Sequence, residues 1–259
     1  MDSRLLPLFV ITPMLAAFLI PLLSKLWSGF ADILANLAGA VLLGLSATGA
    51  AALVGASQPV LHRMGGWLPQ LGIVLVYDPL TALVALSLNA VGCAALVYSL
   101  RYLDHYTGRW KFYTLFMLIL AGLNGVALTG DLFNMFVFIE ISAVASYALV
   151  AFGTDADELE AGFKYMVIGE IGGFSILLAI ALLYAKVSSL NMAVVSQMLA
   201  AQGQSPLFWF IIVLLLIGFA VKMAMVPFHA WLPDAHPSAP APVSALLSGV
   251  FIKVLGVYA

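Results

Sequence analysis

The stretch PLFWFIIVLLLIGFAVKMAMVPFHAWLPDAH, residues 206–236, decides the fold class of this chain. It opens with an apolar run long enough to cross a bilayer as a helix, which takes about 20 residues. Lys222 lies inside that run, and Pro227 follows closely. Because proline removes a helix hydrogen bond and clashes with the preceding turn, we expect the helix to kink or break beside Lys222. Such a break is tolerated in a membrane only where it lines a polar cavity.

Apolar runs of similar length recur along the chain, which has 259 residues, 64% of them hydrophobic and 8% charged. A soluble domain is about half apolar and a quarter charged, so the composition excludes a water-soluble enzyme. Helices fit these runs, because barrel strands would show short alternating stretches. The predicted fold class is therefore all-α, a polytopic transmembrane bundle of about eight helices with a broken seventh helix. The predicted spans are 5–26, 30–54, 79–103, 112–129, 132–152, 162–185, 206–228 and 240–259.

The organisation predicted from these spans is one transmembrane domain over residues 1–259, with three N-terminal helices in 1–103 and the remainder in 112–259. The first span lacks a small-residue cleavage pattern after it, so we interpret it as retained. The segment 191–202 is too short and too amphipathic to span, which predicts a small helix at the membrane surface.

The charges of the chain are few, with 10 basic and 12 acidic residues and a net charge of -2. That is too sparse for a basic groove, so nucleic acid is excluded as a partner. Cys93 is the single cysteine, which leaves no internal disulfide and no thiolate cluster. The loop cations predict a cytoplasmic face for one side of the membrane and an outside N-terminus. The side predicted to be cytoplasmic carries Lys25, Arg101, Arg109 and Lys111, and the outer side carries Arg4, Arg63 and Lys186.

Most charged residues lie in loops or at the ends of the predicted spans, but four lie well inside them, namely Glu140, Glu170, Lys222 and Lys253. Each costs on the order of 2.5–3.5 kcal/mol to place in hydrocarbon, so an intramembrane charge is a functional candidate by default. An alternative for Glu140 and Lys222 is a buried ion pair that only fixes helix packing. Lys253 has no obvious acidic partner at a similar depth, which suits a residue that gains and loses a proton.

The residues around the predicted break add further candidates. His229, Asp234 and His236 permit a metal-site interpretation, but the prolines in this segment favour proton-relay or loop-capping roles. Lys164, at the start of the sixth span, is either an ordinary interfacial lysine or a charge that modulates ion entry. The stretch GEIGG, residues 169–173, lies within a span and predicts a close-packing helix face, not a phosphate loop.

Two longer motifs carry a family resemblance. GDLFNMFVFIE (130–140), followed by Ser146 and Tyr147, resembles the fifth-helix motif of the antiporter-like subunits shared by respiratory complex I, membrane-bound hydrogenases and Mrp-type cation/proton antiporters. KMAMVPFHAWLPDAH (222–236), with its continuation to Lys253, resembles the seventh- and eighth-helix signature of the same subunits. The residues around Glu140 are most similar to those of the D-type Mrp subunit. The resemblance covers essentially the whole chain.

The resemblance implies roles for several residues. Glu140 and Lys222 would form a charge pair, Lys253 would be the central proton carrier, and Lys164 would be the sixth-helix lysine. The chain would be a proton- or sodium-translocating subunit of a multi-subunit complex in the cell inner membrane, either an NADH-quinone- or hydrogenase-type oxidoreductase or a non-redox antiporter. Redox centres belong to other subunits in that family, so no cofactor or metal is expected here. Other membrane subunits and the lipid bilayer are the expected partners.

Two departures from the family pattern leave alternatives open. Full-length members continue into a second, inverted repeat, and we expect that repeat to be absent here because the chain stops at Ala259, six residues after Lys253. The alternative function is therefore a truncated, non-conducting scaffold that only supports assembly of such a complex. Glu170 is not part of the family's core set, and it would be either a local relay group or a partner for Lys253.

Overall fold

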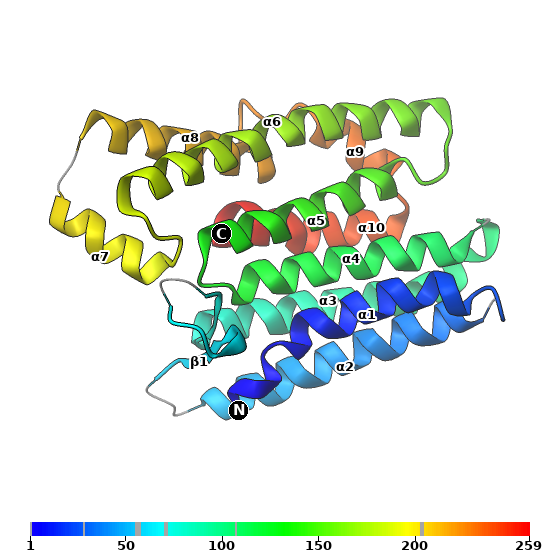
Figure 1. Cartoon of the computed structure of the whole chain (residues 1–259). Helices are drawn as coiled ribbons and strands as arrows, with labels where there is room; N and C mark the ends of the chain where they lie inside the picture. Colours follow the sequence, from blue (N-terminus) through cyan, green and yellow to red (C-terminus); the bar gives the residue numbers. More distant parts are fainter. Residues whose placement is uncertain (1, 28, 55–57, 70–71, 107, 203–204) are drawn as a thin grey trace.

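The chain forms an elongated bundle of helices in a computed structural model, which describes all residues except 1, 28, 55–57, 70–71, 107 and 203–204 (Figure 1). The long helices are α1 (Leu8–Leu23), α2 (Phe30–Leu53), α3 (Pro79–Tyr102), α4 (Arg109–Leu128), α5 (Leu132–Val150), α6 (Ala156–Val187) and α8 (Pro206–Lys222). The shorter elements are β1 (Val60–Arg63), β2 (Val74–Tyr77), α7 (Met192–Gln202), α9 (Leu232–Ser238) and α10 (Ala241–Leu246). Two π-helical segments, Leu247–Phe251 and Lys253–Tyr258, continue α10.

The predicted helical membrane bundle is confirmed, with differences at the ends of helices. Within the described residues, seven helices are long and apolar enough to span a bilayer. The predicted span 206–228 is shorter, because α8 ends at Lys222, and its 17 residues form one half of a broken helix. The span predicted at 162–185 begins earlier, at Ala156, because Asp155 and Glu158 form a capping box that satisfies the first backbone N–H groups.

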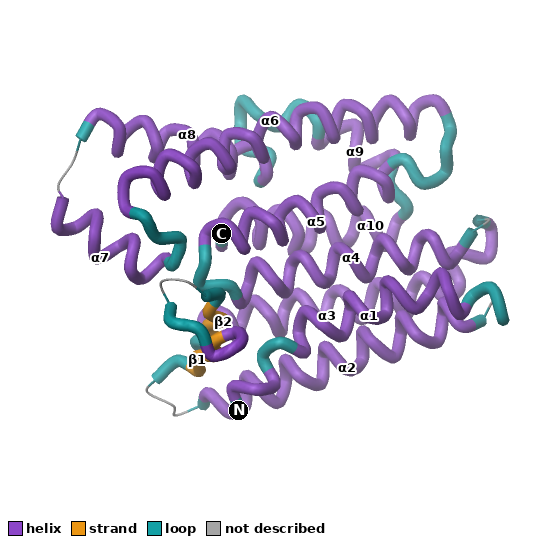
Figure 2. The backbone as a smooth tube through the Cα atoms, viewed as in Figure 1, coloured by secondary structure: helices purple, strands orange, loops and turns teal. Residues whose placement is uncertain are grey.

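A small β-hairpin was not predicted from the sequence. Strands β1 and β2 pair antiparallel, with Val60 opposite Tyr77 and Arg63 opposite Val74. Figure 2 shows the pair as a small orange patch at one end of the bundle. The hairpin packs on helix ends, because Leu75 forms an isolated bridge with Thr129, which follows α4. It thus lies at one end of the bundle, outside the long helices.

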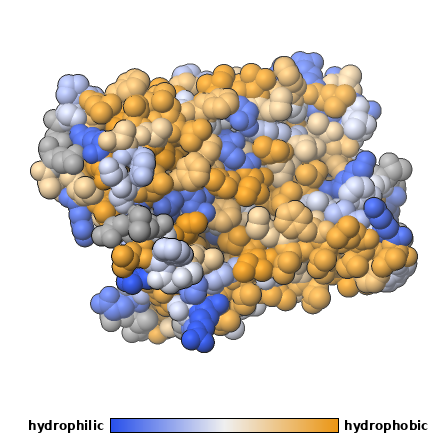
Figure 3. Space-filling model, in the orientation of Figure 1, coloured by the Kyte–Doolittle hydropathy of each residue, from blue (hydrophilic) through white to orange (hydrophobic). Residues whose placement is uncertain are grey.

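The connections between helices gather at the two ends of the bundle, as a polytopic topology requires. The turns after α1, α3 and α5 lie together at one end, and the hairpin, the α4–α5 turn and the α6–α7 turn lie at the other (Figure 1). Lys25 and Arg101 therefore belong to the first end, and Arg63 and Lys186 to the second. Figure 3 shows a largely hydrophobic flank between more hydrophilic ends, which fits a bilayer around the flank.

Helix α4 is the centre of the core, and most of its length is buried, with α1, α3 and α5 among the helices packed around it. A buried polar bridge joins three of these helices. Asn89 of α3 and Asn124 of α4 exchange side-chain hydrogen bonds of 2.9 and 3.0 Å, and Asn89 also donates to Ser46 of α2 at 2.8 Å. Amide bonds of this kind hold membrane helices together where lipid supplies no hydrophobic drive.

Candidate functional site

The charge pair expected from the sequence forms between α5 and α8. Lys222 Nζ lies 3.0 Å from Glu140 Oε1. The Lys222 side chain is only 4% exposed, and that of Glu140 is 20% exposed. Tyr147, two helical turns after Glu140 on α5, places its hydroxyl oxygen 3.5 Å from the same ammonium group. The last residue of α8 is thus a buried cation that α5 neutralises and hydrogen-bonds.

The helix breaks at this lysine, as Pro227 predicts. Helix α8 ends at Lys222, and the chain runs through irregular backbone, with a positive φ at Ala224, before α9 begins at Leu232. Proline at 227 has no N–H to continue the helical hydrogen bonds, so carbonyl groups of the last turn need other partners. Trp231 adds a bond at the end of α8, because its indole Nε1 donates at 3.1 Å to the Val221 carbonyl oxygen, which also accepts from the Ala224 N–H. The break is therefore a defined structure.

An aromatic stack connects the break with the charge pair. The Trp231 ring lies on the Tyr165 ring of α6, with centroids 4.1 Å apart and planes 10° from parallel. Tyr165 in turn meets Tyr147 edge to face at 4.6 Å, and its hydroxyl lies 3.0 Å from Ser146 Oγ. Tyr165 and Trp231 were missed as site residues by sequence reasoning, because their contact depends on how three helices pack. The position of Tyr147, two turns from Glu140, was the available signal.

Glycines of α6 make room for the pair, which confirms the close-packing face predicted at 169–173. A Cβ atom at Gly173 would lie 2.5 Å from Glu140 Oε1, and one at Gly169 would collide with the Tyr147 hydroxyl. Gly172 faces Val221 of α8, where a Cβ would lie 2.9 Å from the valine Cβ. Helix α6 is therefore a smooth wall against which both the acid and the lysine-bearing helix pack.

Glu170 lies on this wall, with the pair and apart from Lys253. It lines a pocket between α5 and α6 together with Tyr147, the residue that also contacts Lys222. It makes no salt bridge to Lys253 in the described part of the chain. Of the two roles expected for Glu170, neither is decided by these contacts, and both stay predictions.

Lys164 lies two turns before Glu170 on α6 and faces solvent. Its ammonium group lies 2.7 Å from Glu160 of the same helix and 2.9 Å from Asp234 of α9. All three side chains are between 44% and 64% exposed, and they border a polar pocket of about 210 Å³ together with Ser238. The cluster fastens α9 to the beginning of α6 at the end of the bundle nearer to Lys222.

The remaining candidates lie further along the broken region. His236 Nδ1 is 2.9 Å from Ser244 Oγ, which joins α9 to α10. Lys253 is exposed and donates to the Ser248 carbonyl oxygen within the π-helical segment, near enough for its charge to act on His236. His229 is exposed in the loop before α9. The structure therefore brings Glu140 and Lys222 together and leaves Lys253 without an acidic partner within the described residues.

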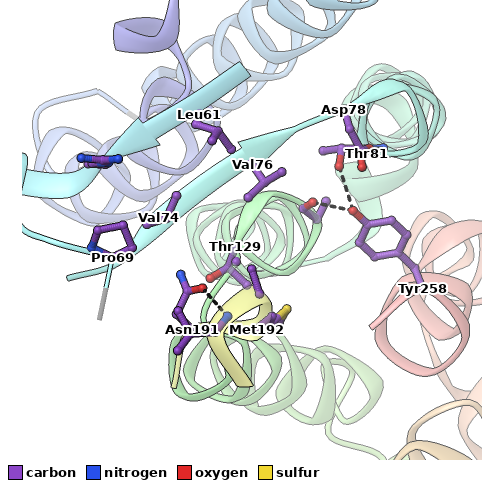
Figure 4. Close-up of a pocket in the computed structure, with 15 residues that line it drawn as sticks. Leu61, Pro69, Val74, Val76, Asp78, Thr81, Thr129, Asn191, Met192 and Tyr258 are labelled. Carbon is purple, nitrogen blue, oxygen red and sulfur yellow. Dashed lines mark hydrogen bonds between the residues drawn. The ribbon is translucent and has the colours of Figure 1, made fainter. Parts of the chain in front are cut away.

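A second pocket, of about 410 Å³, lies at the opposite end of the bundle, under the β-hairpin (Figure 4). Several of its polar side chains are already hydrogen-bonded, either to one another or to the backbone. Tyr258 OH lies 2.9 Å from Thr81 Oγ1 and donates to the Ala127 carbonyl oxygen, while Asp78 and Asn191 accept from backbone N–H groups. The hydrogen bonds around this pocket join helix ends, and the candidate functional site remains the Glu140–Lys222 pair.

Comparisons with known proteins agree with the fold. The family model described as NADH:quinone oxidoreductase/Mrp antiporter, TM, matches residues 129–259. The chain is 39% identical over 98% of its length to NADH-quinone oxidoreductase subunit N of Desulforudis audaxviator (strain MP104C), and 34% identical over 76% to the D-type Na(+)/H(+) antiporter subunit of Bacillus subtilis (strain 168). It covers 51% and 40% of those relatives, so it spans about half of their length or less.

Solved structures match over nearly the whole chain. A chain of the membrane-bound sulfane sulfur reductase, an archaeal respiratory membrane complex, superposes with a TM-score of 0.92 at 30% identity, over 99% of this chain and 51% of that one. A chain of the Mrp complex from Dietzia sp. DQ12-45-1b gives 0.80 at 28% identity, over 98% and 47%. Both matches come from multi-subunit membrane complexes, and each covers about half of the matched chain.

Proposed function

Because the chain belongs to the NADH:quinone oxidoreductase/Mrp antiporter transmembrane family, we propose that it is a membrane subunit that translocates protons or sodium ions through a centre built on Glu140 and Lys222. The observation that carries the proposal is the buried 3.0 Å contact between Lys222 Nζ and Glu140 Oε1 beside a broken helix. An ion pair kept inside a membrane bundle at this cost is typical of an ion pathway.

The pair can act as an electrostatic switch. At an effective dielectric constant of about 20, moving a unit charge from about 4 to 8 Å from another changes their interaction by roughly 2 kcal/mol. Lys222 sits where the backbone of α8 ends, so its ammonium group can change distance from Glu140 without unwinding an intact helix. An opening of this size is enough to alter the ion affinity of a neighbouring group by more than tenfold.

Two lysines complete the pathway that we propose. Lys253 is the carrier that the switch controls, supported by its position on a π-helical segment, a distortion found frequently at functional sites. Lys164 is a charge that modulates ion entry, and its exposed contacts with Glu160 and Asp234 beside the break support this role. His229 and His236 are secondary relay candidates on the same broken segment.

The setting of the subunit is part of the proposal. We place it in the cell inner membrane, in contact with lipid and with other membrane subunits of a complex I-like, hydrogenase-like or Mrp-type complex. The end of the bundle that carries Lys25, Arg101, Arg109 and Lys111 faces the cytoplasm, since short cytoplasmic loops are enriched in lysine and arginine. A protease site inserted at the hairpin, cleaved only from outside intact cells, tests this orientation.

The function is tested by transport in membrane vesicles that contain the assembled complex, followed with a pH-sensitive dye. Lys222→Ala and Glu140→Gln are each expected to abolish most ion transport, while Lys25→Ala, which removes an exposed cation at a helix end, is expected to leave it intact. Unchanged transport in both site variants, with normal assembly, would instead favour a non-conducting scaffold subunit.

A further inference from the structure

Glu170 adds a second carboxyl group to the centre. Gly169 and Gly173 of α6 lie against the Tyr147 hydroxyl and the Glu140 carboxylate, respectively. Glu170 precedes Gly173 by three residues, so the two positions are neighbours on the surface of α6. Glu170 also lines one pocket with Tyr147 of α5, whose hydroxyl lies 3.5 Å from Lys222 Nζ. Two acids from different helices therefore lie near one lysine.

Glu170 also faces the flank of the bundle. It lines a pocket of about 390 Å³ between α5 and α6 whose other walls are mostly apolar, including Val144, Phe163 and Met166. These three side chains are 57%, 63% and 40% exposed, so the pocket opens on the surface that a bilayer or a neighbouring helix would cover. An ionised carboxylate is costly in such surroundings unless a cation compensates it.

The charges around the centre do not balance if every group is ionised. Glu140 and Glu170 carry two negative charges, and Lys222 carries one positive charge. Tyr147 faces the cluster from α5 with a neutral hydroxyl, and Lys164, the nearest other cation on α6, is already engaged by Glu160 and Asp234. Two carboxylates that share a site cannot both ionise easily, and binding one proton removes both the repulsion and the net charge.

We propose that Glu140 and Glu170 share one proton, so that the centre is a three-residue proton-binding site and the ion held there is H⁺. In the loaded state the protonated oxygen of Glu170 donates to the Glu140 carboxylate, whose Oε1 accepts from Lys222 Nζ. Movement of Lys222 away from Glu140 strengthens the hold of the two acids on the proton, and its approach weakens that hold. The inference rests on the proposed function, because it assigns the ion to the same centre.

Infrared spectroscopy of the assembled complex in H₂O and in D₂O tests this directly, since a protonated carboxyl group has a C=O band that ionised carboxylates lack. The spectrum of the wild type minus that of Glu170→Gln, at neutral pH, is expected to contain one such band, shifted in D₂O. Glu160→Gln is the matched control on the same helix, because Glu160 is exposed and paired with Lys164, and its difference spectrum is expected to contain only ionised-carboxylate bands.

Glu140→Gln provides a second variant. It leaves Glu170 as the one acid beside Lys222, so Glu170 is expected to ionise and the protonated band to disappear. A difference spectrum for Glu170→Gln that contains ionised-carboxylate bands, or a protonated band that persists in Glu140→Gln, overturns the inference. This outcome can be told apart from that of the transport assay. If the protonated band is missing but transport still depends on Lys222, only the shared-proton inference is rejected. If the band is present but transport does not depend on Lys222, only the proposed function is rejected.

Discussion

A single methyl group at Gly173 should weaken the charge pair without replacing either of the paired residues. A Cβ atom there would lie 2.5 Å from Glu140 Oε1 and 3.1 Å from its Cδ. An ordinary contact of about 3.4 Å therefore requires the carboxylate to retreat by roughly 0.9 Å. If that shift lengthens the 3.0 Å contact with Lys222, the attraction at an effective dielectric constant of about 20 falls by roughly 1.3 kcal/mol.

The assay is dye-monitored ion transport in vesicles that contain the assembled complex. Gly173→Ala is expected to slow transport by up to about tenfold. Its level in the membrane should not fall, because alanine favours a helix by about 1 kcal/mol over glycine. Gly44→Ala is the matched control, since a Cβ at this mid-helix position of α2 meets no atom within 4 Å. Equal transport rates in the two variants would refute the argument that α6 sets the position of Glu140.

The other predictions concern the break and the core. Trp231→Phe keeps an aromatic ring but removes the hydrogen bond to the Val221 carbonyl, worth about 1 kcal/mol, so transport is expected to fall severalfold with assembly intact. The control is Trp209→Phe, which changes an exposed tryptophan at the start of α8 and should have no effect. Equal loss of transport in both variants would contradict this role of Trp231. Asn89→Leu removes both side-chain hydrogen bonds to Asn124 and is expected to lower the free energy of unfolding by about 1–2 kcal/mol. An unchanged melting temperature of the purified complex would show that the polar bridge does not stabilise the packing of these helices.

Local chemistry made the break and the pair predictable. Proline lacks a backbone N–H and clashes with the preceding turn, so Pro227 indicated the interruption beside Lys222 without any knowledge of the fold. Opposite charges inside two apolar runs likewise indicated Glu140 and Lys222, because each would be costly alone in a membrane. The glycines of 169–173 indicated a close-packed face for the same local reason.

Tertiary packing determined what the sequence did not reveal. The stack of Tyr165 on Trp231 needs α6 and the start of α9 to meet, and no spacing along the chain encodes that meeting. The β-hairpin was missed because its strands are four residues each and lie ten residues apart. Glu170 had two open roles because depth in a span does not say which neighbour a helix faces.

The central claim, that Glu140 and Lys222 act as one unit in ion translocation, is tested most directly by a double-mutant cycle. Transport would be measured for Glu140→Gln, Lys222→Met and the double variant, in vesicles with equal amounts of assembled complex. Because each single change already removes the interaction, the double variant is expected to lose no more activity than the more impaired single variant. Losses that multiply in the double variant would mean that the two residues act independently, and would contradict the account.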